Sequence, residues 1–428
     1  MALNGGGLMR KKILLKAPVL TRSGYGEQSR FALRALRSRE DIYDIYIHPL
    51  QWGQTSWITL QDEERKWIDE TIEKTIAFTQ NKGTFDVSLQ VTIPNEWQRI
   101  APVNIGYTAG IETTTVAPLW LQKANETMNK IVVVSEHAKN SYQGTVANAI
   151  NETTGEKFEY RVNTPIESVG YPVKNYENLP NIDLEVETDF NFLAIAQFGP
   201  RKNLPNTIKW FIEEFHDENV GLIVKTNLSK NCLKDREMTM GNLLRTTKDF
   251  PDRKCKVYLI HGDMSDEEIH SLYLNKKVSA LIALPHGEGF GLPIYEAAYS
   301  GLPLITVGWS GQVDYLYDDD GAHFYEVSYD INRVQPEVVW ENVLIAESAW
   351  AYAREQSAKE AMRLCHNDII NNAKDSIASN AQAYAAVLNN KYSEQKMYAK
   401  FISCIYDEPE EIDFQNWSEE QQGAQDID

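Results

Sequence analysis

Two kinds of apolar pattern alternate along the chain. Short β-branched and aromatic runs take turns with amphipathic segments, as parallel βαβ units require. In the first half we expect strands over residues 12–17, 43–50, 85–92, 104–109, 130–135 and 167–172. The pattern then restarts, with strands expected over residues 192–197, 221–226, 257–260, 280–284 and 303–307. The chain therefore predicts two successive parallel sheets.

Two of the intervening segments carry clear helix signals. Apolar residues recur with helical spacing at Ile208, Phe211, Ile212 and Phe215, which predicts one buried helix face. Ser265 is followed three residues later by Glu268, the capping-box pattern of a helix start. These signals favour an α/β protein in which helices cover the sheets.

The expected domain organisation follows from where the pattern stops and restarts. Residues 1–175 form a first Rossmann-like, doubly wound domain, and the polar stretch 176–190 is a linker. Residues 191–365 form a second Rossmann-like domain. Helices over 366–405 are expected to pack back on the first domain, and residues 406–428 form an acidic tail.

Composition narrows the class of protein. Hydrophobic residues make up 43% of the chain, enough for packed cores. No stretch approaches the roughly 18–20 apolar residues of a membrane helix. The cysteines are widely separated and form no CxxC pair: Cys232, Cys255, Cys365 and Cys404. A reducing, cytoplasmic location is therefore expected, with neither a disulfide framework nor a zinc site.

The net charge of −19 is unevenly distributed. Residues 1–39 contain nine Lys or Arg and one acid, whereas residues 406–428 contain nine acids and no base. The basic end suits an anionic partner, or it consists of scattered arginines that solvate a helix. The acidic end is typical of a solvated tail.

The segment 286–316 carries the clearest chemical signal. It follows a buried strand, and its glycine-rich start leads into a helix near Pro293. Ligands of open α/β sheets bind beyond the carboxyl ends of strands, and glycines let the backbone approach them closely. The helix N-terminus favours a diphosphate. Glu288 and Glu296, eight positions apart, would then accept hydrogen bonds from sugar and ribose hydroxyls.

The run EGFGLPIYEA within this segment resembles the E-x7-E motif of retaining GT-B glycosyltransferases of family four. The resemblance implies a GT-B fold, in which two Rossmann-like domains face each other across a cleft. It also implies that Glu288 contacts the transferred sugar and Glu296 the nucleotide ribose. The donor-binding residues that it implies between them are Gly289, Phe290, Gly291 and Leu292. The plainer interpretation is a glycine-rich turn with a capping glutamate.

A cation pair is expected to neutralise the diphosphate. Arg201 and Lys202 lie at the turn after the strand over 192–197. Two adjacent cations there can stabilise a departing diphosphate. Family-four enzymes usually carry an arginine five residues before the lysine, but this chain has Gln197 there, so Arg201 is expected to replace it. Lys225 is a third candidate, or else a surface lysine.

Further donor contacts are expected from two turns and a loop. In relatives the HGDM turn lies over the nucleobase, which assigns Gly262 and Met264 to donor binding, while His261 is equally a structural histidine. His286 is a candidate donor contact. The loop with Gly24 and Gly26 follows the first strand and is expected to meet the diphosphate from across the cleft.

The acceptor side is less defined. Glu112 lies beyond a strand end and is a candidate to orient or deprotonate the acceptor, or else caps a helix. Trp52 and Trp97 are candidates to stack on an acceptor ring, or else belong to the core. Arg30 and Arg34 share one helix face and are candidates to contact an anionic acceptor.

The resemblance to family-four glycosyltransferases implies sugar transfer with retention from a nucleoside-diphosphate sugar, UDP- or GDP-linked, to a hydroxyl. The nucleotide sugar is a substrate, and neither a metal nor another cofactor is expected. A glycan-type acceptor is favoured, with hydroxymethylated bases in DNA as the alternative. A non-catalytic nucleotide-sugar-binding protein is the alternative of a different class. A dehydrogenase is disfavoured because no GxGxxG follows a first strand.

Overall fold

The computed structural model describes residues 10–405 except 54 and 151–152, so the expected acidic tail lies outside the described residues. The first half forms a six-stranded parallel sheet in the order β2-β1-β3-β4-β5-β8. Its strands are β1 (Lys11–Ala17), β2 (Tyr43–Pro49), β3 (Val87–Val91), β4 (Val103–Thr108), β5 (Lys130–Val133) and β8 (Ile166–Ser168).

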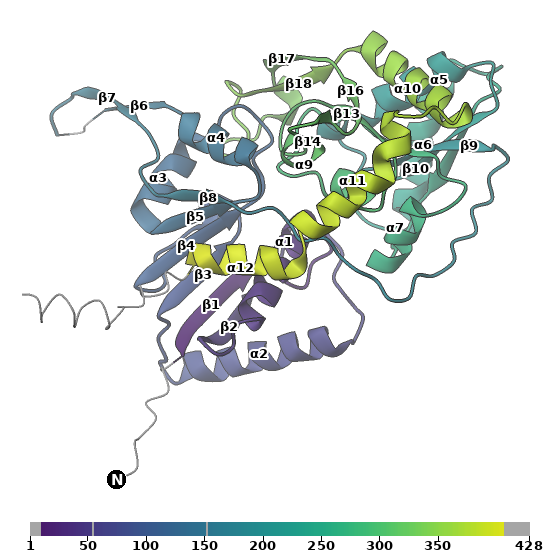
Figure 1. The fold of residues 1–428 in the computed structure, drawn as a ribbon. Coiled ribbons are helices and arrows are strands. Elements are labelled where there is room, and N and C mark those ends of the chain that lie inside the picture. The colour runs from purple at the N-terminus through teal and green to yellow at the C-terminus, as the bar shows by residue number, and fades with distance from the viewer. Residues whose placement is uncertain (1–9, 54, 151–152, 406–428) are drawn as a thin grey trace, which may run out of the picture.

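Helices cover this sheet and one hairpin projects from it (Figure 1). The helical segments are α1 (Gly24–Arg37), α2 (Glu63–Gln80), the short 3₁₀ helix η1 (Pro94–Glu96), α3 (Pro118–Thr127) and α4 (Glu136–Gly144). The hairpin pairs β6 (Ala147–Ile150) with β7 (Lys157–Tyr160). Ser23 begins α1, because its side chain accepts a hydrogen bond from the backbone N–H of Gly26.

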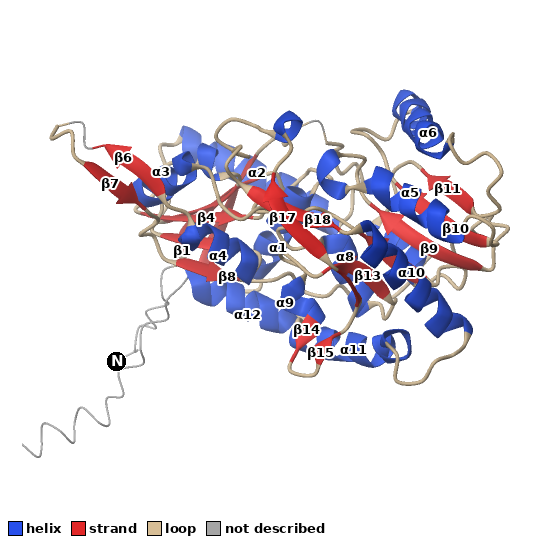
Figure 2. Cartoon of the chain, turned by 90° about the horizontal axis from the view of Figure 1, so that it is seen from above, coloured by secondary structure: helices blue, strands red, loops and turns tan. Residues whose placement is uncertain are grey.

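The second half repeats the arrangement with a sheet in the order β11-β10-β9-β12-β13-β16, also parallel throughout. Figure 2 shows the two sheets at opposite ends of the molecule. The second sheet consists of β9 (Phe190–Ile195), β10 (Val220–Lys225), β11 (Lys256–Ile260), β12 (Ala280–Ala283), β13 (Leu304–Val307) and β16 (Tyr325–Val327).

The second domain also contains helices, and their apolar faces are buried. These helices are η2 (Pro200–Lys202), α5 (Leu204–Phe215), α6 (Leu233–Thr247), α7 (Asp266–Tyr273), α8 (Leu292–Tyr299), α9 (Val313–Leu316), η3 (Pro336–Val338) and α10 (Glu355–Ile370). The buried face predicted on α5 is confirmed, since Ile208, Phe211 and Phe215 are all 0% exposed. The predicted capping box is confirmed as well, because Ser265 and Glu268 exchange both hydrogen bonds. The boundary expected at residue 365 falls inside α10.

The remaining elements are the hairpins β14 (Tyr317–Asp318) with β15 (Gly321–Ala322) and β17 (Tyr329–Arg333) with β18 (Ala349–Ala353), and the helices α11 (Ile377–Lys391) and α12 (Glu394–Ile405). Of these elements, α12 and the loop between β17 and β18 reach the first domain. Figure 1 shows α12, in yellow, lying across the first domain. There Phe401 packs on Phe31 of α1 with ring centroids 5.2 Å apart. The loop between β17 and β18 also reaches the first domain, where the Asn342 carbonyl accepts from Trp120.

The predicted strands are found close to their expected positions, but the pattern missed four short elements or pairs: β16, β6–β7, β14–β15 and β17–β18. Several of the missed strands, such as β7 and β17, lie largely exposed, so they carry no apolar run that would mark them in the sequence. The hydrophobic cores of the two domains also meet. One hydrophobic cluster joins Phe31 and Tyr107 of the first domain to Phe290 and Tyr295 of the second.

Candidate active site

A cleft of about 670 Å³ lies between the carboxyl ends of the two sheets. Both domains line it, and most of the predicted site residues contribute to its wall. From the first domain these are Gly24, Arg30, Trp52 and Glu112; from the second they are Arg201, Lys202, Gly262, Met264, Glu288, Gly289, Phe290, Gly291, Leu292 and Glu296. The described residues contain no group of three or more His, Cys, Asp or Glu side chains arranged to hold a metal ion.

The loop between β12 and α8 presents Glu288 to the cleft. Gly291 ends this loop with φ of +89°, a conformation that L side chains rarely adopt. A Cβ on Gly289 would lie 2.0 Å from the carbonyl oxygen of Ala109, so only glycine lets the loop touch the first domain there. The backbone N–H of Glu288 donates to Ser310, which fixes the loop from behind.

Glu288, only 7% exposed, is held by two cations. Its carboxylate lies 2.9 Å from Arg201 and 2.5 Å from Lys202, both on η2 at the end of β9. Burial raises the pKa of Glu288, but the two cations outweigh burial and hold it below the ordinary value. Burial and the neighbouring Arg201 lower the pKa of Lys202. The cluster therefore places two hydrogen-bond-donating cations beside one ionised carboxylate.

Arg201 also joins the two domains. Its guanidinium lies 3.2 Å from Glu112, which follows β4 in the first domain, and donates to the carbonyl oxygen of Gly287. Burial, with Glu288 nearby, raises the pKa of Glu112 although Arg201 opposes the shift. The cations expected at a diphosphate and the carboxylate expected at the acceptor thus meet in one network.

Glu296 faces the other end of the cleft from α8. Tyr273 donates its hydroxyl proton to Glu296 at 3.0 Å. Burial raises the pKa of Glu296 to about 7, against the opposing effect of Lys174. A carboxylate has two accepting oxygens, so Glu296 can accept from hydroxyls such as those of a ribose as well as from Tyr273.

Hydrogen bonds from neighbouring elements hold the turn after β11 in place. Gly262 has φ of +123° and its carbonyl accepts from Lys225, which also lines the cleft. His261 lies 2.9 Å from the Asp235 carboxylate, which accepts three backbone N–H groups of the preceding loop. His261 therefore holds the turn rather than facing the cleft. Gln197 lines the cleft, but its amide donates to Leu228.

Several predicted residues lie elsewhere. Trp97 is 0% exposed and packs on Gly106 in the core of the first domain, which corrects its assignment to an acceptor site. His286 does not line the cleft, because its ring stacks on Trp350 with centroids 5.2 Å apart and bonds the Ala351 carbonyl. A Cβ on Gly26 would lie 2.0 Å from the Thr21 carbonyl, so this glycine serves packing.

The predicted basic face of α1 is also corrected. Arg30 lines the cleft but is 8% exposed, pairs with Glu27 and donates to the Val19 and Thr21 carbonyls. Arg34 makes two hydrogen bonds to Glu64 on α2. Arg37 stacks over the Trp67 ring at 4.4 Å. Arg30 meets an acid three residues away on its own helix, whereas Arg34 and Arg37 meet an acid and a ring that tertiary folding brings close.

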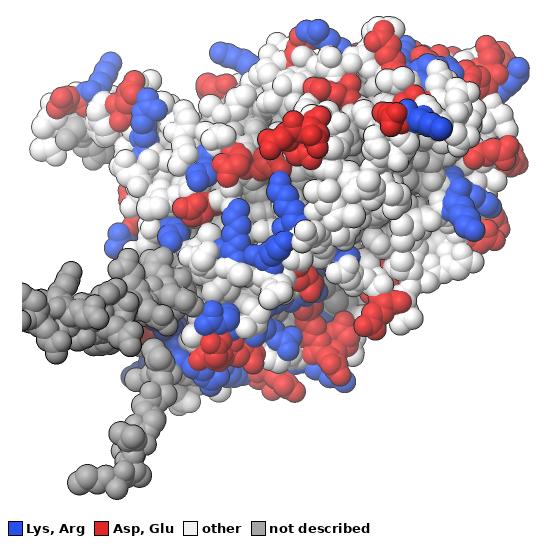
Figure 3. All heavy atoms as spheres, in the orientation of Figure 1, with Lys and Arg blue, Asp and Glu red and all other residues white. Residues whose placement is uncertain are grey.

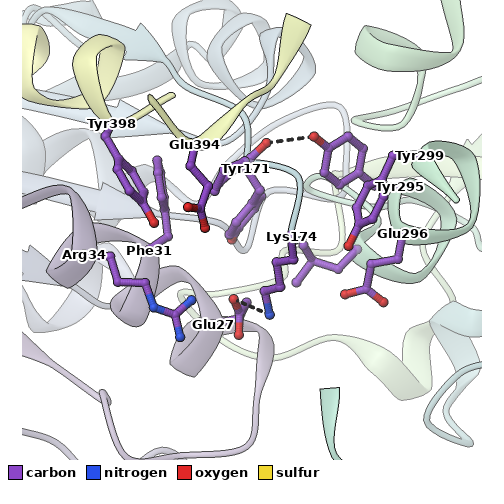
Figure 4. Close-up of a pocket in the computed structure, with 12 residues that line it drawn as sticks. Glu27, Phe31, Arg34, Tyr171, Lys174, Tyr295, Glu296, Tyr299, Glu394 and Tyr398 are labelled. Carbon is purple, nitrogen blue, oxygen red and sulfur yellow. Dashed lines mark hydrogen bonds and ion pairs between the residues drawn. The ribbon is translucent and has the colours of Figure 1, made fainter. Parts of the chain in front are cut away.

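Three residues were missed by the sequence patterns. Lys174, Tyr273 and Asp266 line the cleft near Glu296. Tyr273 is an apolar-face position of the predicted α7 pattern, so its hydroxyl carried no separate signal. Lys174 lies just before the polar stretch predicted as a linker, where the sequence pattern indicates no role for it. Figure 4 shows Lys174 between Glu27 and Glu296, an arrangement that no local spacing reveals.

Comparisons with known proteins agree with this geometry. Residues 254–333, which include the turn after β11 and Glu288 and Glu296, match the family described as Glycosyl transferases group 1. Solved structures share the architecture over nearly the whole chain. Anabaena HepE in complex with UDP and glucose has 12% identity and a TM-score of 0.54, covering 92% of this chain and 99% of that one. The fold is GT-B.

Two further relatives bear on the comparison. Sucrose-phosphate synthase from Thermosynechococcus elongatus has 11% identity and a TM-score of 0.56, covering 92% of this chain and 98% of that one. The serotype-specific mannosyltransferase WbdA of Escherichia coli is 24% identical over 199 residues, 44% of this chain. The match covers 22% of WbdA, so this chain aligns with about a fifth of that relative. None of the helices among residues 10–405 has the length and apolar character to span a bilayer.

Proposed function

We propose that this protein is a glycosyltransferase that moves a sugar, with retention, from a nucleoside-diphosphate sugar to an acceptor hydroxyl. The observation that carries the proposal is one cleft in which Arg201 and Lys202 face Glu288 while Glu296 faces the opposite end. The family match over 254–333 supports it. UDP is the favoured nucleotide, because HepE of similar fold binds UDP.

The cluster suggests how the diphosphate is bound and released. Arg201 and Lys202 are both paired with Glu288. A diphosphate entering the cleft offers these cations stronger acceptors, and the charge that grows on the leaving oxygen strengthens those contacts during bond breaking. Glu288 is then free to accept from a hydroxyl of the transferred sugar.

Glu112 is proposed to orient the acceptor hydroxyl. It lies on the first-domain side of the cleft and reaches the same Arg201 that faces the diphosphate. In a retaining transfer the leaving phosphate oxygen takes the acceptor proton on the same face of the sugar, so the protein must chiefly place the two substrates. A carboxylate anchored by Arg201 can hold that hydroxyl in place.

A carbohydrate-type acceptor is favoured over DNA. Trp52, which stacks on Tyr25 with centroids 4.2 Å apart and lines the cleft, offers a flat apolar surface for a sugar ring. The arginine face that favoured DNA is instead engaged within the first domain. On the face drawn in Figure 3, basic and acidic side chains are interspersed rather than gathered into one basic surface.

The decisive experiment follows the released nucleoside diphosphate from UDP- and GDP-sugars, with and without an oligosaccharide acceptor. We expect release that depends on the acceptor, and a product whose anomeric configuration, read by NMR, matches the donor. Tight donor binding with no release under any condition would instead favour the non-catalytic nucleotide-sugar-binding protein. An inverted product would leave glycosyl transfer standing and overturn retention.

A further inference from the structure

Two cations from the first half of the chain contact the same part of the second domain, the turn between β11 and α7. Arg22, just before α1, donates from Nη1 to the carbonyl oxygen of Met264 at 3.2 Å. Lys174, beyond the end of β8, lies 2.8 Å from Asp266 in the first turn of α7. Both contacts cross the cleft at the end that Glu296 occupies.

Lys174 also binds the first domain directly. Its ammonium lies 2.7 Å from Glu27 of α1, and its side chain is 16% exposed (Figure 4). Burial opposes the charge of Lys174, but Glu27 and Asp266 outweigh burial and raise the pKa of Lys174 above its ordinary value. Burial likewise opposes the charge of Glu27, yet Lys174 and Arg30 hold the pKa of Glu27 well below its ordinary range. Lys174 and Glu27 are therefore both ionised in this ion pair.

The same lysine faces the carboxylate expected at the nucleotide. Lys174 is the main charge that favours ionised Glu296 against burial, whereas Asp266 and Glu27 oppose that ionisation. Without Lys174, Glu27 of α1 would keep Arg30 as a partner. Asp266, whose side chain is 58% exposed, would lose its ion pair to the first domain, and Glu296 would lose the cation that favours its ionised form. Loss of the Lys174 ammonium therefore removes an electrostatic attraction between the domains.

We propose that Lys174 and Arg22 are positioning residues that clamp the β11–α7 turn and Glu296 against α1, so that the nucleotide half of the cleft is formed only when the domains are closed. The nucleotide part of this proposal rests on the proposed function. The domain part does not, since it concerns the ligand-free protein as well. Removal of the clamp should weaken nucleotide binding more than it slows the chemical step.

The test uses full-length Lys174→Met, Lys174→Arg and Arg22→Met. Lys139→Met is the matched control, because Lys139 lies 3.5 Å from Glu167 and joins α4 to β8 inside one domain. Small-angle scattering measures the radius of gyration with and without UDP. Calorimetry measures the UDP affinity, and steady-state kinetics separates donor KM from kcat.

We expect Lys174→Met to enlarge the ligand-free radius of gyration and to weaken UDP binding by about tenfold, within the usual range of site coupling. Donor KM should rise more than kcat falls, and Lys174→Arg should restore most of the affinity. Arg22→Met should shift both readouts in the same direction by less, and Lys139→Met should shift neither.

Folded Lys174→Met with the wild-type radius and the wild-type UDP affinity would overturn the clamp. If circular dichroism shows that Lys174→Met does not fold, Lys174→Arg and Arg22→Met decide the question by the same readouts. If the wild-type protein binds no nucleotide, the proposed function fails, and the scattering of the ligand-free variants still decides whether the clamp exists.

Discussion

Lys202 and Arg201 contact the same buried carboxylate, that of Glu288, but their pKa values shift in opposite directions. Burial lowers the pKa of Lys202, whereas burial of Arg201 is outweighed by Glu112 and Glu288, so the pKa of Arg201 is raised. Lys202 contacts Glu288 alone, so one ammonium can be redirected to charge that grows on a leaving oxygen. The arginine, with three protein contacts, is the fixed partner.

Lys202→Ala should therefore lower kcat more than it raises donor KM. Loss of one preorganised donor to developing charge costs about 10²-fold or more in kcat. Steady-state kinetics with the donor identified by the screen measures both constants. Lys209→Ala, which removes a half-exposed lysine on the outer side of α5, is the control and should change neither. A rise in KM alone would make Lys202 a uniform binding contact.

Glu296 should make nucleotide binding depend on pH. Its pKa of about 7 means that it is mostly protonated at pH 6 and mostly ionised at pH 8. Since the ionised form is the better acceptor for ribose hydroxyls, UDP affinity should rise by about tenfold over that range, following the ionised fraction. Lys174 and the Tyr273 hydroxyl favour the ionised form, whereas Asp266 and Glu27 oppose it.

Calorimetry of wild type and Glu296→Gln at the two pH values tests this expectation. The phosphate of UDP titrates in both proteins, so only the difference between them reports on Glu296. Glu296→Gln should bind UDP more weakly at pH 8 and show the smaller pH dependence. Equal affinities at pH 8 in a folded variant would remove Glu296 from the nucleotide site.

At the scale of elements, the β12–α8 loop is the part whose conformation the site most needs. Its backbone lies against the loop after β4, with Gly289 at the Ala109 carbonyl and Gly287 at the Glu112 carbonyl. These approaches leave no room for a Cβ. The glycines thus serve contact between domains as much as contact with a ligand.

Gly289→Ala should consequently disturb both stability and activity. The added Cβ would lie 2.0 Å from a backbone oxygen, so the loop or the domain must shift. Overpacking of this kind costs about 1–3 kcal/mol, which thermal unfolding would show as a lower Tm. Sugar transfer should fall with it. Gly199→Ala is the control, because its Cβ would meet nothing within 4 Å; an unchanged Tm for Gly289→Ala would contradict the tight interdomain contact.

For the whole molecule, the open question is the class of acceptor, and salt dependence separates the candidates. Each phosphate contacted on duplex DNA contributes a log–log slope of about −0.9, so three contacts would give about −3. Because Arg30 and Arg34 are already paired with Glu27 and Glu64, we expect a slope near zero. Acceptor KM for hydroxymethylated duplex DNA and an oligosaccharide, measured in parallel from low to moderate salt, checks this.

Arg34→Ala extends the same test. It should lower Tm, because Glu64 loses both hydrogen bonds, and should leave acceptor KM unchanged. Glycosylation of DNA with a steep salt slope that Arg34→Ala reduces would reverse the preference for a carbohydrate acceptor.

The sequence by itself determined the features that depend on neighbours along the chain. Two runs of alternating strands and helices, the capping box at Ser265 and the buried face of α5 follow from short-range periodicity and capping, and all are present in the structure. The presence of both Glu288 and Glu296 in the cleft belongs to this group as well. Both lie on one loop and helix, so a fixed spacing places both in the cleft.

Tertiary structure alone decided which charged side chains meet partners distant in the chain. Arg34 finds Glu64 on another helix, and Trp97 enters the core because Gly106 leaves space on the next strand. Lys174 meets Glu27 through the folding of the first domain, and it meets Asp266 only because the two domains close on each other. A charged group is stable in water but costs free energy when it is buried without a partner. Residues distant in the chain therefore decide whether such a cation is a solvated surface group or part of a buried ion pair. That choice has no local signature in the sequence.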